Sequence, residues 1–134
     1  MDYIYRRERF LTADRCTPQN EMPLQSLVRE LIEMATLHAN NLGVGYDRMH
    51  ELGLAWVLSR LSVEMERWPQ VNTSYTIETW VQNHNRRFSE RDFRITDADG
   101  CTLGYARSIW MAIDEKTRAG GDLSQLTPLV EFLL

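Results

Sequence analysis

The feature that most constrains the fold is the stretch from Pro23 to Asn41, PLQSLVRELIEMATLHANN. Its apolar residues recur at spacings of three and four and cover more than one side of a helix, a wider surface than a helix lying on a core needs. We therefore expect a helix that other elements wrap, although one amphipathic core helix among several is the commoner origin of such a pattern. At about 1.5 Å per residue it would be roughly 28 Å long, about the width of a small domain. Pro23 suits the first turn and Gly43 suits a left-handed C-terminal cap.

Length and composition indicate one ordinary domain. The chain has 134 residues, 43% hydrophobic and 25% charged, with a net charge of -4. A chain of this size can bury a substantial core, and its negative charge gives no support to nucleic acid binding. Cys16 and Cys101 are too few and too far apart for a disulfide framework or a metal site, so we expect both to pack as small apolar residues. No residue spacing suggests a metal or an organic cofactor.

The cellular location is also predicted from composition. No apolar run approaches the roughly 18 residues of a membrane span. The N-terminal segment MDYIYRRERF lacks the apolar region of a signal peptide. We therefore expect a cytoplasmic protein with no membrane partner.

The remaining segments have the period of β-strands, with apolar, β-branched and aromatic residues at every second position. Between the predicted helix and the next strand, glycines at positions 43, 45 and 53 indicate a loop with at most a short helical turn. Asp99-Gly100 is a hairpin signal. Beyond Gly120-Gly121 a short apolar tail, 120–134, either packs down or begins another element. The expected strands are 3–12, 54–69, 73–82, 86–97 and 102–114.

Two of these strands carry informative faces. In 54–69, one phase holds Val57, Leu61, Val63 and Met65, and the other holds Trp56 and Leu58. In 102–114, one face is large and apolar, and the other has small residues that would let something large approach closely: Gly104, Ala106, Ser108 and Ala112. A strand, a long helix and four strands joined by short turns form an α+β meander. We predict a single hot-dog domain, a curled antiparallel β-sheet around one long central helix.

A series of motifs in the same order resembles one particular family. The motifs are Trp56-Val57-x-x-Arg60, Trp68-Pro69, Thr79-Trp80-Val81, Arg91-Asp92, Asp97 with Gly100, Ser108 with Trp110, and Thr117-Arg118. Together, from about Arg9 to Arg118, they resemble the N-terminal hot-dog half of the acyl-acyl-carrier-protein (acyl-ACP) thioesterases of plants and bacteria. The resemblance implies hydrolysis of the thioester that joins a fatty acyl chain to its carrier protein, the step that ends fatty acid synthesis.

The catalytic set implied by the resemblance is not found in this sequence. Members of the family carry two hot-dog halves, and the second half holds the catalytic carboxylates, Asn and His in an Asp-x-Asn-x-His pattern ahead of its helix. This sequence stops before a second half would be expected. In the equivalent loop here, Asp14 fits the first position, but Cys16 and Pro18 replace the Asn and the His. We assign no catalytic residue, and Asn20 and Glu21, near the helix start, are the only candidates.

The resemblance also suggests substrate-binding residues. Met34, Leu37, Trp56, Leu58 and Leu61 would lie between helix and sheet, either as core or as the wall of an acyl tunnel. Arg60 is either a substrate-side residue or an exposed arginine in an ion pair. Of the histidines, His38 is expected to be satisfied by a loop carbonyl and His84 to lie in a turn.

A basic cluster in an acidic protein suggests where a partner would dock. Carrier proteins are acidic, so we expect Arg86, Arg87 and Arg91 to help dock one, with the strand that holds Arg6, Arg7 and Arg9 as the alternative. A solvated strand face is the simpler interpretation of the same cluster.

Three functions remain open. The first is the substrate-holding half of an acyl-ACP thioesterase, paired with a C-terminal half or with a copy of itself. The second is a stand-alone homodimeric hot-dog thioesterase acting on acyl-coenzyme A or acyl-ACP, with Asn20 and Glu21 working across the dimer interface. The third is a non-catalytic module that binds acyl thioesters.

Overall fold

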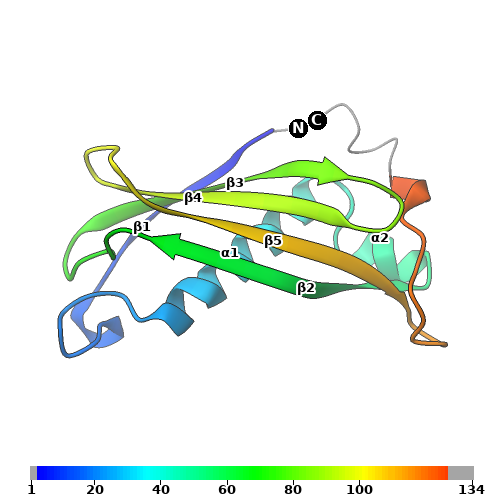
Figure 1. Ribbon diagram of the computed structural model, residues 1–134, viewed down its shortest axis with the longest axis horizontal. Coiled ribbons are helices and arrows are strands. Elements are labelled where there is room, and N and C mark those ends of the chain that lie inside the picture. The colour runs from blue at the N-terminus through cyan, green and yellow to red at the C-terminus, as the bar shows by residue number, and fades with distance from the viewer. Residues whose placement is uncertain (1–2, 127–134) are drawn as a thin grey trace.

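A five-stranded antiparallel sheet packs one face against a long helix (Figure 1). The computed structural model describes residues 3–126, and the strand order in the sheet is β1-β3-β4-β5-β2. This is the predicted hot-dog arrangement. Its elements are β1 (Tyr5–Phe10), a 3-10 turn η1 (Ala13–Arg15), α1 (Leu24–Asn41), α2 (Tyr46–Glu51), β2 (Leu54–Met65), β3 (Ser74–His84), β4 (Ser89–Asp97), β5 (Thr102–Asp114) and a second 3-10 turn η2 (Ser124–Leu126).

Both termini of helix α1 lie close to the positions that the sequence predicts. Pro23 has an extended backbone and precedes the first helical residue, so it lies just outside the predicted first turn. Its carbonyl accepts the amide of Ser26 at 3.1 Å. At the other end Gly43 has a φ of +79°, the left-handed conformation predicted for the cap.

The sheet covers one side of α1. The buried residues of the helix recur every three or four positions and form one stripe: Leu27, Glu30, Leu31, Met34, Ala35 and His38. Leu24 and Ile32 lie outside the stripe and remain exposed. The apolar surface of α1 is thus wider than the part that the sheet covers within this chain.

A β-bulge in β2 changes which of its side chains face the helix. Leu58 pairs with Trp110 and Arg60 pairs with Ile109, so Ser59 is an extra residue in β2. Trp56 and Leu61 therefore both pack against the core, although they are an odd number of positions apart. The predicted grouping of Val57 with Leu61 is wrong, because Val57 lies before the bulge and is exposed.

The small face of β5 is the face that packs inward. Gly104, Ala106, Ser108 and Ala112 are buried, whereas Tyr105 and Met111 are exposed. Gly104 lies opposite Met65 in the edge strand β2. Without a side chain at this position, the two strands approach closely.

A buried polar contact fastens α1 to the middle of the sheet. The Tyr75 hydroxyl lies 2.6 Å and 2.9 Å from the two carboxylate oxygens of Glu30. Arg9 Nε in β1 lies 3.4 Å from the same carboxylate. Burial and the hydrogen bond to Glu30 raise the pKa of Tyr75 above its usual range, so the phenol stays protonated as the donor.

The last described residues pack onto the fold. Leu123 and Leu126 are buried in an apolar cluster with Leu42 and Met49. This confirms that the tail packs down as far as residue 126, and the rest of the predicted tail, 127–134, lies outside the described residues. Cys16 packs against the core as expected. The same expectation is wrong for Cys101, which is exposed beside the β4–β5 turn.

Within residues 3–126, no helix combines the length and apolar character needed to span a membrane.

We predict that Gly104→Ala destabilises the fold by about 1–3 kcal/mol. The new Cβ would meet the Sδ of Met65 and would lie 2.5 Å from the backbone carbonyl oxygen of Glu64, which cannot move without disturbing β2. Denaturant unfolding measures the change. Gly120→Ala is the matched control, because a Cβ there meets no atom within 4 Å. Equal unfolding midpoints for the two variants would contradict the close strand approach.

We also predict that Tyr75→Phe destabilises the fold by about 1–3 kcal/mol, because it leaves the buried Glu30 carboxylate without the phenol donor. Tyr105→Phe removes a hydroxyl from an exposed tyrosine and should change stability by less than about 0.5 kcal/mol. Thermal unfolding of both variants provides the comparison. A Tyr75→Phe protein as stable as the Tyr105→Phe control would show that the contact contributes nothing net.

Candidate functional site

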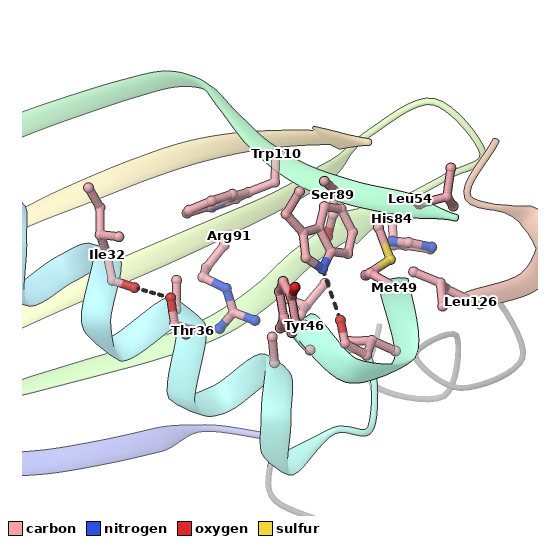
Figure 2. A pocket seen from close by; sticks show the side chains of 17 residues that line it. Ile32, Thr36, Tyr46, Met49, Leu54, His84, Ser89, Arg91, Trp110 and Leu126 are labelled. Atoms are coloured by element: carbon pink, nitrogen blue, oxygen red, sulfur yellow. Dashed lines mark hydrogen bonds between the residues drawn. The ribbon is translucent and has the colours of Figure 1, made fainter. Parts of the chain in front are cut away.

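A cavity of about 370 Å³ lies between the C-terminal half of α1, α2 and the adjoining ends of the strands (Figure 2). This volume falls in the range of natural small-molecule pockets, about 300–1,000 Å³. Its walls are mainly apolar, with Ala39, Met49, Leu54, Trp56, Val81 and Trp110 among the lining residues. The volume of the cavity and its mainly apolar lining suit an alkyl chain.

Small side chains on α1 leave the space open. Ala35, Thr36 and Ala39 lie on the side of the helix that faces the cavity. On the sheet side, Trp56 Nε1 donates to the Val44 carbonyl at 2.9 Å, and Trp110 Nε1 donates to Ser108 Oγ at 2.9 Å. Because both indole N–H groups are satisfied, the rings can face the cavity without leaving a polar group unpaired.

Strands β3 and β4 give the cavity a polar wall. Val81 pairs with Arg91 and Asn83 with Glu90, so Gln82 is an extra residue. This bulge lets both Val81 and His84 face inward. Ser89 pairs with His84 across the two strands, and Ser89 and Arg91 share one face of β4. We call His84, Ser89 and Arg91 the polar wall (Figure 2).

Arg91 lies inside the protein, where it has 6% of its surface exposed. Its Nη1 lies 2.7 Å from His38 Nδ1 and donates to Thr79 Oγ1 at 3.2 Å. Because a guanidinium only donates, Nδ1 of His38 accepts, and we assign His38 as the neutral tautomer protonated on Nε2. Burial lowers the pKa of Arg91 to about 10, which leaves it charged at neutral pH. This burial corrects the predicted docking role of Arg91, since a partner's surface cannot reach it.

The two buried histidines differ from their predicted settings. His38 is fully buried, contacts Arg91, and stacks on the Tyr5 ring at a centroid distance of 5.6 Å. The environment of His38 therefore includes Arg91 and Tyr5, and is not the loop carbonyl alone that the sequence predicts. His84 belongs to the end of β3, not to a turn, and only 9% of it is exposed. Burial lowers the pKa of His84, and its Nε2 has no hydrogen-bond partner within residues 3–126.

The predicted substrate-binding residues are divided between cavity, core and surface. Trp56 lines the cavity, whereas Met34 and Leu61 belong to the main core cluster. Leu37 and Leu58 are partly exposed, and Arg60 is exposed, opposite Ile109. Of these predicted residues in the described chain, Trp56 alone lines the cavity.

The catalytic candidates lie at the other end of α1, in the loop that follows η1 (Figure 1). Asn20 is exposed and has a φ of +62°. Glu21 forms an isolated bridge with Gln70, whose Nε2 lies 3.4 Å from the Glu21 carboxylate. Asp14 in η1 is also exposed, and a side-chain hydrogen bond with Thr12 lowers its pKa. The structure therefore does not bring the candidates to the cavity.

The cavity can hold a chain, and His84 supplies the one imidazole among its described lining residues. No Asp or Glu is among its described lining residues. In the part of the chain that the structure describes, no group of three His, Cys, Asp or Glu residues is placed to hold a metal ion.

The sequence contains a signal for the inward position of Arg91. Phe93 and Ile95 follow it at spacings of two, and both are core residues. A strand's side chains alternate between faces, so Arg91 shares their inward phase. The position of His84 had no such signal, because it depends on the bulge at Gln82.

Sequence comparison identifies a family. A family model described as the acyl-ACP thioesterase N-terminal domain matches residues 3–125. The chain is 31% identical over 102 residues to the chloroplastic oleoyl-acyl carrier protein thioesterase 2 of Arabidopsis thaliana, an alignment that covers 71% of this chain and 28% of that protein.

Structural comparison agrees. An acyl-ACP thioesterase from Bacteroides thetaiotaomicron has a TM-score of 0.87 at 31% identity, and the match covers 89% of this chain and 49% of that one. The 12:0-ACP thioesterase from Umbellularia californica has a TM-score of 0.88 at 20% identity, over 98% of this chain and 51% of that one, and shares the fold. The chain thus spans about half the length of these two structures and about a quarter of the plant relative. Because the family model matches nearly the whole described sequence, the chain belongs to the acyl-ACP thioesterase family and corresponds to its N-terminal domain.

Proposed function

We propose that this chain is the acyl-holding half of an acyl-ACP thioesterase and that its cavity takes the fatty acyl chain. The observation that carries the proposal is the apolar cavity at the small-residue side of α1. Each methylene that leaves water for such a cavity contributes about 0.8 kcal/mol, so a long acyl chain gains affinity from this surface alone.

A second hot-dog unit supplies the chemistry in this proposal. Thioester hydrolysis needs a side chain that positions water and donors that stabilise the oxyanion. The described cavity lining has no carboxylate, and the loop of Asp14, Cys16 and Pro18 lies at the opposite end of α1. The second unit is either a C-terminal half or a copy of this chain. Edge strand β2, with its 12 residues, offers unpaired backbone groups to it.

The β3–β4 turn is the proposed docking surface for an acidic acyl carrier protein. Arg86 and Arg87 are exposed in the turn between His84 and Ser89, both of which line the cavity. They form no ion pair with any residue in 3–126. The alternative strand β1 is less suitable, because each of its arginines already contacts a carboxylate on Glu30, Glu33 or Glu78.

A cytoplasmic location is part of the proposal. Cys16 and Cys101 are free thiols, which suits a reducing compartment.

We predict that Ala39→Trp weakens binding of hexadecanoyl carrier protein by about tenfold or more and changes octanoyl binding much less. The indole would occupy space next to the acyl chain, and excluding two methylenes costs about 1.6 kcal/mol. Calorimetric titration measures both affinities. Gln25→Trp adds the same ring at an exposed position at the start of α1 and should leave both affinities unchanged. Equal losses for the two chain lengths would count against the cavity as the acyl site.

We predict that joint reversal of Arg86 and Arg87 to Glu weakens carrier-protein binding by about tenfold at low salt, because exposed charges attract an acidic partner over a Debye length of about 10 Å or more. Raising the salt should shrink the difference. Reversal of Arg15 and Arg29, both exposed toward the other end of α1, changes the net charge equally and serves as the control. Similar losses from the two pairs would point to net charge and not to docking at this turn.

A further inference from the structure

The polar wall contains a positive charge that the described protein does not neutralise. Arg91 forms no ion pair with a carboxylate within residues 3–126, and its two hydrogen bonds go to the neutral groups His38 Nδ1 and Thr79 Oγ1. Both bonds come from Nη1, and neither Nε nor Nη2 donates to a described protein group. The guanidinium therefore keeps unused donors beside the cavity it lines.

This arrangement is costly unless something else pairs with the charge. Moving an ion out of water costs several kcal/mol even after the protein relaxes. Elsewhere in this fold the buried charge of Glu30 meets Tyr75 and Arg9. Among residues 3–126 Arg91 has no equivalent partner, although its burial is similar.

A second unsatisfied group lies along the same wall. His84 is 9% exposed and lines the cavity, but its Nε2, which has no hydrogen-bond partner within residues 3–126, is buried. Ser89 pairs with His84, lies two residues before Arg91 on β4, and also lines the cavity. Arg91 and Ser89 thus contribute a charged donor and a hydroxyl to the cavity wall, whereas Nε2 of His84 is itself buried and the His84 ring lies toward Leu126, away from the Arg91 guanidinium (Figure 2).

We propose that Arg91, together with the hydroxyl of Ser89, forms a carboxylate-binding subsite inside the acyl cavity, for a carboxylate carried by an alkyl chain. The inference rests on the proposed function, since the same cavity holds the chain. A carboxylate neutralises the guanidinium, and its two oxygens match the planar donor fork. A neutral hydroxyl or ester would leave the charge buried. The alkyl part would lie against Ala39, Trp56 and Trp110.

Two kinds of molecule carry this chemistry. One is a free fatty acid, whose single carboxylate would enter the subsite and make the product of thioester hydrolysis a ligand of this half. The other is an acyl chain with a second carboxylate at its far end, which would make the subsite a specificity determinant for dicarboxylic substrates.

The test compares three head groups on one chain. Decanoate, decanol and decylammonium are titrated calorimetrically into the wild-type chain at neutral pH. We expect decanoate to bind at least about tenfold more tightly than decanol, and decylammonium to bind more weakly than both. Decanol that binds as tightly as decanoate overturns the subsite and leaves the acyl cavity intact. Failure of all three ligands to bind overturns the acyl cavity as well.

A variant locates the effect at Arg91. Arg91→Met keeps the length and apolar stem of the side chain, and should reduce the preference for decanoate over decanol to about twofold or less while decanol still binds. Arg107→Met makes the same change at an exposed arginine that pairs with Asp92, and should keep the wild-type preference. A preference that survives Arg91→Met overturns the proposal. Circular dichroism checks folding, and if Arg91→Met does not fold, the wild-type head-group series decides alone.

The monomethyl ester of decanedioic acid separates the two sources. It carries one carboxylate and an ester at the other end of the same chain. Binding at least as tight as that of decanoate supports a dicarboxylic acyl chain, whereas exclusion of the ester supports a free fatty acid. Either result keeps the carboxylate subsite.

Discussion

The contact between the buried stripe of α1 and the concave face of the sheet is the constraint on which the rest of the structure depends. Leu27, Leu31 and Met34 pack in one core cluster with Tyr75 and Phe93, from the first turn of the helix to just past its middle. In the C-terminal half of α1 the residues that face the cavity are small, and the facing residues on the sheet include the large rings of Trp56 and Trp110. The cavity lies where this packing changes, so core and candidate site are two ends of one interface.

Bulges in two strands decide which side chains reach that interface. A period of two would separate Trp56 from Leu61, and Val81 from His84, onto opposite faces. One extra residue in β2 and one in β3 bring both members of each pair inward. The bulge in β2 thus lets Trp56 contribute an aromatic ring to the cavity wall, and the bulge in β3 lets His84 contribute an imidazole. Neither bulge changes the order of the strands.

Glu30 on α1 and Arg91 on β4 are both buried charged residues, and their settings differ. Glu30 is surrounded by donors from β1 and β3, and its network fixes the helix on the sheet. Arg91 meets neutral partners and faces a cavity, so its charge is available to a ligand. A satisfied polar network contributes rigidity, whereas an unsatisfied one marks a position where a bound molecule can add stability. The described cavity lining contains no Asp or Glu.

The sequence by itself determined the helix, the five strands, the cap at Gly43 and the family, because periodicity and ordered motifs are local properties of the chain. It also contained the inward phase of Arg91 in its spacing from Phe93 and Ile95, although its charge suggested a surface role. Only the tertiary structure decided the inward position of His84, the outward position of Val57 and the location of the cavity at the far end of α1 from Asn20 and Glu21. The reason is physical. A bulge is defined by how two paired strands align, with one extra residue in one of them, and a cavity forms where the side chains of two packed elements are too small to fill the space between them. Neither is a property of one segment read alone.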